Sequence, residues 1–338
     1  MIRFSEYFNS WLYEKDGYYT DYKNIGKEGD FFTSVSASSF FGGAIAKKII
    51  STIESGFLDK NSTILEIGAE KGYLLADIIQ FIFTLKPELL KTLNFAILEK
   101  YESLIDIQNE YLFNSFGNYI NFRHYKTLEE LKINSAFIVS NEIFDSFACD
   151  LVRTKDNILN QAFVKEHKIE FLPCKDEDIL NHCKKYGIKK GEISLEYLDF
   201  ITKLCENIKT FEFITFDYGE RKPREDFSIR VYKEHKVYPF FEENLDLKYF
   251  YKNSDITYDV HFEYLMDCFT LQGVENLELK TQINALIDFG ILDLLEILKA
   301  NVDEKSYQKE LGRIKTLLNP NQLAERFKCL IARKMKNE

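Results

Sequence analysis

The stretch TILEIGAEKG, residues 63–72, decides the fold of this chain. A strand-forming run, TILEI, leads into a turn that holds Gly68 and Gly72, and a long apolar segment follows. A hydrophobic strand that ends in a glycine turn before a helix brings a ligand to the backbone N–H groups at the N-terminus of that helix. An ordinary β-turn-α connection has the same pattern, so the rest of the chain has to decide between the two interpretations.

Strands and helices alternate through the first half of the chain. Strands are expected at 63–67, 94–98, 119–124 and 136–139, and helices at 73–85 and 101–114. This alternation predicts βαβ units and a parallel sheet whose strand carboxyl ends meet at one edge. The later expected elements are a strand pair in 150–172, a helix at 193–209, strands ending at Asp217 and covering 277–281 and 327–333, and helices at 282–300 and 303–318. One sheet with insertions explains this order better than two independent domains.

Acidic residues fall at the ends of the predicted strands. Glu66 and Glu99 close the first two strands, and Glu142 and Asp145 follow the fourth. A carboxylate at the end of the second strand accepts hydrogen bonds from both hydroxyls of a ribose, which makes Glu99 a candidate for holding a nucleoside. A solvated strand end is the alternative interpretation for Glu99.

The turn after the first strand does not match a dinucleotide loop. It lacks G-x-G-x-x-G, because Ala69, Glu70 and Lys71 separate the two glycines. The carboxylate of Glu70 would repel a pyrophosphate, whereas a sulfonium cofactor carries positive charge near its methyl group and has no phosphate. The turn therefore favours S-adenosylmethionine over NAD, with Glu66, Gly68, Ala69, Gly72 and Glu99 as the candidate cofactor residues.

Composition narrows the classes of partner and compartment. The 338 residues are 45% hydrophobic and carry a formal net charge of -10, which argues against nucleic acid and anionic membrane as ligands and suits a cationic one such as a basic peptide. The six cysteines form no CxxC pair, so no metal site is expected. No apolar run is long enough to span a membrane, and the acidic N-terminal segment does not resemble a presequence. A cytoplasmic protein without membrane insertion is the expectation.

Several blocks of the sequence, in order, resemble the MidA-like methyltransferases. The N-terminal blocks are GYYT (17–20), IGKEGDFFTS (25–34) and FFGG (40–43), and LEIGAEKGYLLADI (65–78) and LEKYESLIDIQ (98–108) follow. The later blocks are NEIFDSF (141–147), FDYGE (216–220), SIRVYKEH (228–235), DITYDVHF (255–262), TQINALIDFGI (281–291) and ERFKCLIA (325–332). The GDFFTS and NEIFD blocks are the most specific of these.

This resemblance implies an α/β fold, a Rossmann-like class I methyltransferase sheet with an N-terminal cap and helical and β insertions. It implies that residues 1–55 cap the cofactor site and that residues 56–338 form the methyltransferase domain, with insertions at about 150–210 and 236–320. It also implies S-adenosyl-L-methionine as cofactor, contacts from Gly29, Asp30, Thr33 and Ser34, and methylation of an arginine on a respiratory complex I subunit. The family usually has proline, glycine and arginine where this chain has Ala69, Glu70 and Lys71, and Glu70 favours the alternative of a weak or inactive enzyme that acts as an assembly factor.

The acceptor site is expected on the acids after the fourth strand. A guanidinium is always charged, and carboxylates bind it in a fork, so Glu142 and Asp145 are the candidate catalytic residues, with Asn141 orienting the loop or the cofactor. The alternative role of these acids is to cap a helix N-terminus. Asp217 and Tyr218 close a central strand and are candidates to face the substrate, together with His235, although a structural turn and a packed histidine explain them equally well.

Overall fold

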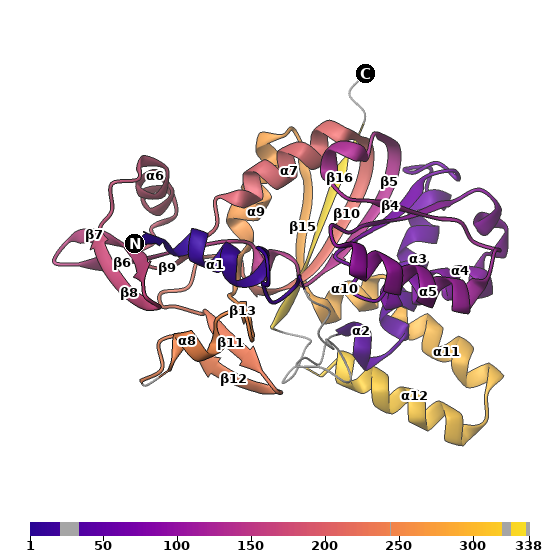
Figure 1. Ribbon diagram of the computed structural model, residues 1–338. Coiled ribbons are helices and arrows are strands. Elements are labelled where there is room, and N and C mark those ends of the chain that lie inside the picture. The colour runs from indigo at the N-terminus through magenta and orange to yellow at the C-terminus, as the bar shows by residue number, and fades with distance from the viewer. Residues whose placement is uncertain (21–33, 244, 320–325, 336–338) are drawn as a thin grey trace. The chain divides into compact units, whose positions relative to one another are not determined.

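The computed structural model describes residues 1–20, 34–243, 245–319 and 326–335 (Figure 1). The chain forms two compact units. The N-terminal unit consists of Met1–Phe31, Glu142–Ile201 and Tyr218–Cys268. The parallel-sheet unit consists of Phe32–Asn141, Thr202–Asp217 and Phe269–Glu338. The chain passes from one unit to the other within α7 (Glu196–Asn207), β10 (Ile208–Glu220) and α9 (Phe262–Leu271).

The parallel-sheet unit is built on one sheet in the order β15-β16-β10-β5-β2-β3-β4. Besides β10, its strands are β2 (Thr63–Ile67), β3 (Asn94–Leu98), β4 (Phe122–Tyr125), β5 (Ile133–Asn141), β15 (Asn276–Thr281) and β16 (Phe327–Lys334). Neighbours from β10 to β4 are parallel, whereas β15 and β16 are antiparallel. The chain places β3 and β4 on one side of β2, and later β5 and β10 on the other. The order therefore reverses at β2, the position where open α/β sheets bind ligands.

Helices cover this sheet. They are α2 (Ser34–Ala37), α3 (Phe40–Glu54), α4 (Tyr73–Leu85), α5 (Glu102–Phe116), α10 (Gln282–Asp288), α11 (Ile291–Asn301) and α12 (Glu304–Leu317), with the 3-10 turns η1 (Pro87–Lys91) and η2 (Leu128–Glu130). α3 packs against α4 and α11, and α2 packs against α12. Residues 64–67 of β2 are all buried, as expected for a parallel strand that is covered on both faces.

The N-terminal unit contains two small antiparallel sheets. The first has the order β1-β7-β6-β9 with β8 on β7, and the second has the order β12-β11-β13. Their strands are β1 (Ile2–Arg3), β6 (Asp150–Lys155), β7 (Ile158–Lys165), β8 (Lys168–Pro173), β9 (Lys190–Ile193), β11 (Arg230–Lys233), β12 (Lys236–Pro239) and β13 (Asp255–Thr257). The remaining elements are α1 (Phe4–Leu12), η3 (Phe144–Ser146), α6 (Glu177–Tyr186), α8 (Leu247–Phe250) and β14 (Val260–His261), which pairs with the end of β10.

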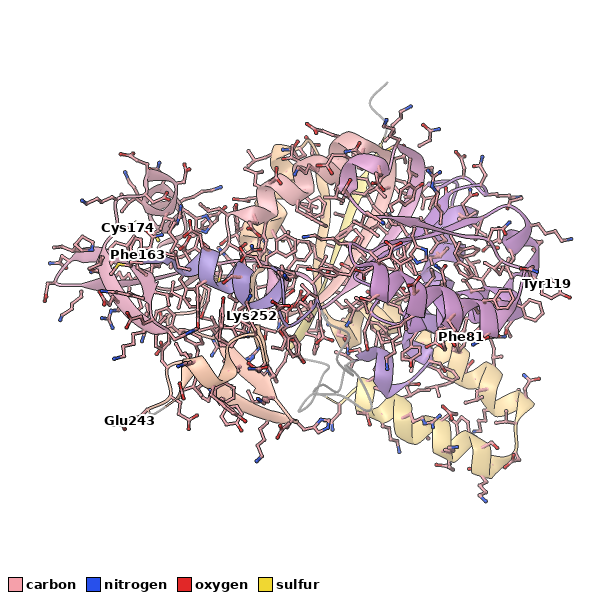
Figure 2. All side chains as sticks on the ribbon, in the orientation of Figure 1. Phe81, Tyr119, Phe163, Cys174, Glu243 and Lys252 are labelled. Carbon is pink, nitrogen blue, oxygen red and sulfur yellow. The ribbon has the colours of Figure 1, made fainter. Side chains whose placement is uncertain are left out.

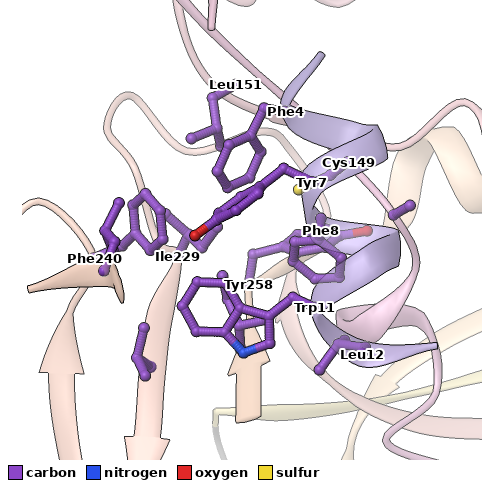
Figure 3. Packing of buried hydrophobic residues seen from close by; sticks show 14 of the residues in the cluster. Phe4, Tyr7, Phe8, Trp11, Leu12, Cys149, Leu151, Ile229, Phe240 and Tyr258 are labelled. Carbon is purple, nitrogen blue, oxygen red and sulfur yellow. The ribbon is translucent and has the colours of Figure 1, made fainter. Parts of the chain in front are cut away.

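The core of the N-terminal unit forms around α1 (Figure 3). The side chains of Phe4, Phe8 and Trp11 recur at helical spacing and are all fully buried. They belong to one cluster with aromatic residues of the later strands, among them Phe240 and Tyr258. The indole Nε1 of Trp11 donates to the backbone oxygen of Ser254 at 2.7 Å, so this large buried ring keeps its hydrogen bond.

The structure confirms most of the expected elements and corrects some bounds. β2, α4 and β3 have the predicted residues, whereas β5 is longer than predicted and residues 150–173 form three strands instead of two. The helix expected at 282–300 is two helices, because Gly290 adopts a left-handed conformation with φ of 87° between them. α6 was not predicted. The division into a cap at 1–55 and a domain at 56–338 stays a prediction.

A close approach of α3 and α4 explains the FFGG block. A Cβ atom on Gly42 would lie 2.6 Å from the Cβ atom of Asp77 and 3.3 Å from the backbone nitrogen of Ile78. A Cβ atom on Gly43 would lie 2.7 Å from the ring of Phe81, a residue labelled in Figure 2. The two glycines therefore let α3 pack directly on the helix that follows the glycine turn.

We predict that Gly42→Ala lowers the free energy of unfolding by about 2 kcal/mol, because the new methyl group overpacks the α3–α4 contact. Alanine stabilises a helix by up to ~1 kcal/mol relative to glycine, so helix propensity alone predicts a gain in stability for this variant. The matched control is Gly312→Ala in α12, where no atom lies within 4 Å of the new Cβ and a small gain is expected. Urea unfolding of both variants measures the difference, and equal stability of the two would contradict the packing role of Gly42.

Candidate functional site

The turn after β2 is a tight, left-handed connection. Three of its residues have positive φ, namely Gly68 at 72°, Glu70 at 47° and Gly72 at 82°. The backbone nitrogen of Gly72 donates to the oxygen of Ala69 at 2.7 Å, and that of Gly68 donates to the oxygen of Leu98 at 3.4 Å. Gly72 is the N-cap of α4 and has no side chain with which to cap it. The first backbone N–H groups of α4 therefore need hydrogen-bond acceptors from other residues.

Glu66 supplies the missing cap. Its side chain is 4% exposed, and its Oε2 accepts a hydrogen bond from the backbone nitrogen of Leu75 at 3.0 Å. Burial raises the pKa of Glu66 to about 8, and the nearby acids Asp77 and Glu70 act in the same direction. The carboxyl group predicted to contact the cofactor thus also joins the end of β2 to the first turn of α4.

Glu99 follows the last residue of β3, and hydrogen bonds from neighbouring residues hold its carboxylate. The backbone nitrogen of Tyr101 donates to its Oε1 at 3.0 Å, and the Nε2 of Gln108 donates to its Oε2 at 3.4 Å. The side chain is 7% exposed, and burial raises its pKa. A carboxylate offers about four acceptor positions, so these bonds orient the group and leave capacity for further donors.

The sequence includes Gln108 in a block that resembles the family but assigns no role to it, and it does not single out His124. Gln108 is fully buried on α5, and its Oε1 lies 3.0 Å from the Nε2 of His124 on β4. The helical spacing could have indicated that Gln108 is buried, because it lies on the same face of α5 as the buried Ile105 and Leu112. A polar residue on such a face needs partners, which the sequence could not name.

Glu70 combines backbone strain with an unsatisfied carboxyl group. It adopts φ of 47°, a conformation that a glycine accepts without strain. Within the described parts of the chain its buried Oε1 has no hydrogen-bond partner, and burial raises the pKa of the group. This is the position at which the resembling family has glycine, so the chain keeps the glycine conformation with a larger residue.

The predicted residues of the N-terminal blocks are only partly within the described chain. Gly29, Asp30 and Thr33 lie outside the described residues. Ser34 is fully buried at the start of α2, and its Oγ donates to the Oε1 of Gln282 at 2.9 Å. Its hydroxyl therefore joins α2 to α10 within the parallel-sheet unit.

The predicted acceptor acids of the N-terminal unit surround a tyrosine. Asp145 is 3% exposed in η3, and Glu142 is partly buried and adopts φ of 55°. The pKa of the Tyr218 hydroxyl is raised first by burial and then by the charges of Glu142, Tyr232 and Asp145. Both carboxylates therefore act on the same hydroxyl. The N-cap of η3 is Ile143, and no side chain caps that turn.

Arginine and tyrosine side chains stand beside these acids. The guanidinium carbon of Arg230 lies 5.3 Å from the centre of the Tyr218 ring, and its Nη2 lies 2.7 Å from the Oδ1 of Asp259. Asn141 is the last residue of β5 and Asp217 is a fully buried residue of β10, both in the parallel-sheet unit. His235 lies in the exposed two-residue turn between β11 and β12, where it adopts φ of 61°. The structure thus brings Glu142, Asp145 and Tyr218 together and places His235 in a hairpin turn.

A parallel sheet whose order reverses at β2, with a glycine turn there and an acid after β3, is a Rossmann-like arrangement, which class I methyltransferases share. The chain belongs to the family described as "Putative S-adenosyl-L-methionine-dependent methyltransferase", whose model matches residues 44–279, more than half of the chain. S-adenosyl-L-methionine is the cofactor of this family, as the glycine turn predicted.

Relatives with assigned names extend the similarity over most of the chain. The mitochondrial protein arginine methyltransferase NDUFAF7 of Rattus norvegicus is 24% identical over 341 residues, which cover 92% of this chain and 76% of the relative. Its Caenorhabditis elegans homologue, also named mitochondrial, is 24% identical over 282 residues, which cover 74% of this chain and 63% of the relative. These mitochondrial names contradict the cytoplasmic location that was expected from composition and from the acidic N-terminal segment.

Solved structures share the fold. A Burkholderia thailandensis protein crystallised with bound S-adenosyl-homocysteine has a TM-score of 0.83 at 20% identity, covering 100% of this chain and 89% of that one. A native crystal structure of a protein from the same organism has a TM-score of 0.80. Of the helices in the described parts of the chain, none is both long and apolar enough to cross a membrane.

The turn and its neighbours fit S-adenosyl-L-methionine chemically. The oriented carboxylate of Glu99 retains acceptor capacity for ribose hydroxyls. The buried Oε1 of Glu70, which has no hydrogen-bond partner among the described residues, would be able to accept a hydrogen bond from the cofactor's ammonium group when it is ionised.

We predict that Glu66→Gln changes how stability depends on pH. The pKa of Glu66 is raised from 4.5 to about 8 in the folded protein, so its contribution to stability is fully present below about pH 4.5 and is lost as the pH rises through about 8. A glutamine keeps the acceptor for the Leu75 N–H group and does not titrate. The free energy of unfolding of the native protein minus that of the variant should therefore fall between pH 5 and pH 9 in urea titrations. A constant difference would show that the carboxyl group titrates normally.

We predict that Glu70→Gly raises the free energy of unfolding by about 1 kcal/mol, because it relieves a left-handed non-glycine residue and removes a buried carboxyl group. The control is Asp156→Gly, since Asp156 has φ of 52° in an exposed turn and tests the backbone contribution alone. Thermal and urea unfolding should give the larger gain for Glu70→Gly. An equal gain for both variants would exclude a cost from the buried carboxyl group.

Proposed function

We propose that this protein transfers a methyl group from S-adenosyl-L-methionine to an arginine side chain of a protein partner. Membership of the methyltransferase family supports the reaction class. The names of the rat and Caenorhabditis elegans relatives, both protein arginine methyltransferases, support the acceptor. The acidic pair Glu142 and Asp145 is the observation in this chain that carries the proposal.

A guanidinium requires negative charge at its binding site, because it stays protonated throughout the accessible pH range. The carboxylates of Glu142 and Asp145 both raise the pKa of Tyr218, which means that their negative potentials overlap at one hydroxyl. The neighbouring Arg230 is already ion-paired with Asp259 at 2.7 Å. The charge of Arg230 also acts on Asp145. The negative potential of the acids after β5 suits a cationic ligand, and the net charge of -10 acts in the same direction.

The chemistry assigned to these residues is binding, orientation and proton removal. When bound, S-adenosyl-L-methionine would supply a methyl group for a guanidinium nitrogen, with S-adenosyl-homocysteine as the leaving group. Glu142 and Asp145 would bind the guanidinium in a fork, and Asn141 would orient the loop that carries them. The proton that leaves the methylated nitrogen passes to a carboxylate or to water.

The second candidate function is a methyltransferase fold that acts in assembly through protein binding, with weak or absent turnover. Glu70 is the observation that favours it, because a side chain replaces glycine where the backbone should approach the cofactor. Calorimetric titration with S-adenosyl-L-methionine separates the two functions, since undetectable binding would leave only the assembly role. The acceptor to examine first is an arginine of a respiratory complex I subunit, which the family resemblance implies, by mass spectrometry of proteins from a deletion strain.

We predict that Glu142→Gln lowers methyl transfer to the protein acceptor by about 100-fold or more while cofactor affinity changes less than about twofold. The amide keeps the shape of the side chain and loses the charge that binds the guanidinium. Transfer of labelled methyl groups to a deletion-strain extract measures turnover, and calorimetry measures cofactor binding. Glu166→Gln, at an exposed turn of the same unit, is the control and should leave both unchanged. Unchanged turnover of Glu142→Gln would remove Glu142 from the catalytic site.

A further inference from the structure

One buried amide contacts the turn after β2, the residue after β3 and a residue of β4. The Nε2 of Gln108 donates to the backbone oxygen of Glu70 at 2.8 Å and to the Oε2 of Glu99 at 3.4 Å. Its Oε1 lies 3.0 Å from the Nε2 of His124. Gln108 thereby connects the turn after β2, the acid after β3 and the edge strand β4, and it is fully buried.

The orientation of this amide follows from its partners. A carbonyl oxygen and a carboxylate oxygen, from Glu70 and Glu99, are both acceptors, so the amide nitrogen has to face them. The Oε1 of Gln108 then faces His124, which has to donate from its Nε2. Burial lowers the pKa of His124, and its Nε2 carries a proton in the imidazolium and in the matching neutral tautomer. Rotating the amide by half a turn would set oxygen against two acceptors, so the three partners define one orientation.

We propose that Gln108 is a positioning residue for cofactor binding, which fixes the glycine turn relative to the carboxylate of Glu99. This inference rests on the proposed cofactor site. The turn and Glu99 contact different parts of one ligand, so their separation has to be set before the ligand binds. A protein that holds both groups in place loses less conformational freedom on binding and binds more tightly. His124 supports the same arrangement by holding the amide oxygen.

Packing is the competing role for Gln108. A Cβ atom on Gly72 would lie 3.8 Å from the Cγ of Gln108, so the side chain also fills space beneath the turn. Glutamate has nearly the same shape as glutamine, whereas methionine is apolar and of similar length. A packing role predicts that glutamate is the milder replacement. A positioning role predicts the opposite, because a carboxylate at 108 has no donor and faces the carboxylate of Glu99 and the carbonyl of residue 70.

Calorimetric titration with S-adenosyl-homocysteine tests this on the full chain. We expect the dissociation constant to rise about 10-fold for Gln108→Met and about 100-fold for Gln108→Glu. The control is Gln161→Glu, since Gln161 is also buried and donates to a carboxylate, Asp150, at 3.1 Å within the N-terminal unit. That variant should lose thermal stability and keep its affinity. Wild-type affinity in Gln108→Glu, or a milder effect than in Gln108→Met, would overturn the positioning role.

A second variant covers the case in which the Gln108 variants do not fold. His124→Phe removes the donor to the amide oxygen at a partly buried edge-strand position, and we expect the dissociation constant to rise about threefold. An unchanged dissociation constant would count against the arrangement. Absence of binding to the wild-type protein would overturn the proposed function together with this inference, whereas binding that is insensitive to all three substitutions would overturn only the inference.

Discussion

The hydrogen bond from the Leu75 backbone nitrogen to the buried carboxyl group of Glu66 organises the cofactor edge. Gly72 lets the chain reverse from β2 into α4, but a glycine cannot cap the helix that it starts. Glu66 of β2 caps the helix instead of Gly72. Burial of its carboxyl group raises the pKa to about 8. Because α4 begins so close to the end of β2, the backbone oxygen of residue 70 comes within reach of Gln108. The turn, the helix and the acid after β3 thus depend on one another.

The elements that could be predicted are those whose sequence signals lie within a few neighbouring residues. β2, α4 and β3 were predicted with their bounds, because hydrophobic periodicity and the glycine turn specify them within a few residues. β5 was predicted too short, since the residues beyond the predicted 136–139 are polar apart from Ile133 and belong to the strand through pairing with its neighbours. α6 was missed because its sequence, EDILNHCKKY, is mostly polar and is held by an Asp176 cap and by a core of distant residues. Contacts of this kind are tertiary, so periodicity does not report them.

The residues of the candidate site also differ in whether a local sequence signal identifies them. Glu66 and Glu99 could be identified from their places at strand ends, because parallel strands bring those ends to one edge. Gln108 and His124 could not, since their importance lies in hydrogen bonds to residues 70 and 99, which the sequence separates from them. The role predicted for His235 stays a prediction. This residue stands in a family block, and the structure places it in a two-residue hairpin turn beside Glu234, where both residues have positive φ. A turn of that geometry explains its position without any contact to a substrate.

Burial affects the charge that Glu70 carries. From the sequence alone, Glu70 is expected to carry a fixed negative charge that repels anionic groups from the cofactor turn. Burial raises its pKa, so the group takes up a proton more readily than a solvated glutamate does. A protonated carboxyl group donates a hydrogen bond to a carboxylate, and an ionised one accepts a hydrogen bond from an ammonium group. The methionine part of S-adenosyl-L-methionine carries both groups. What opposes cofactor binding at this position is therefore the volume and backbone strain of the residue, since its charge adapts to either partner.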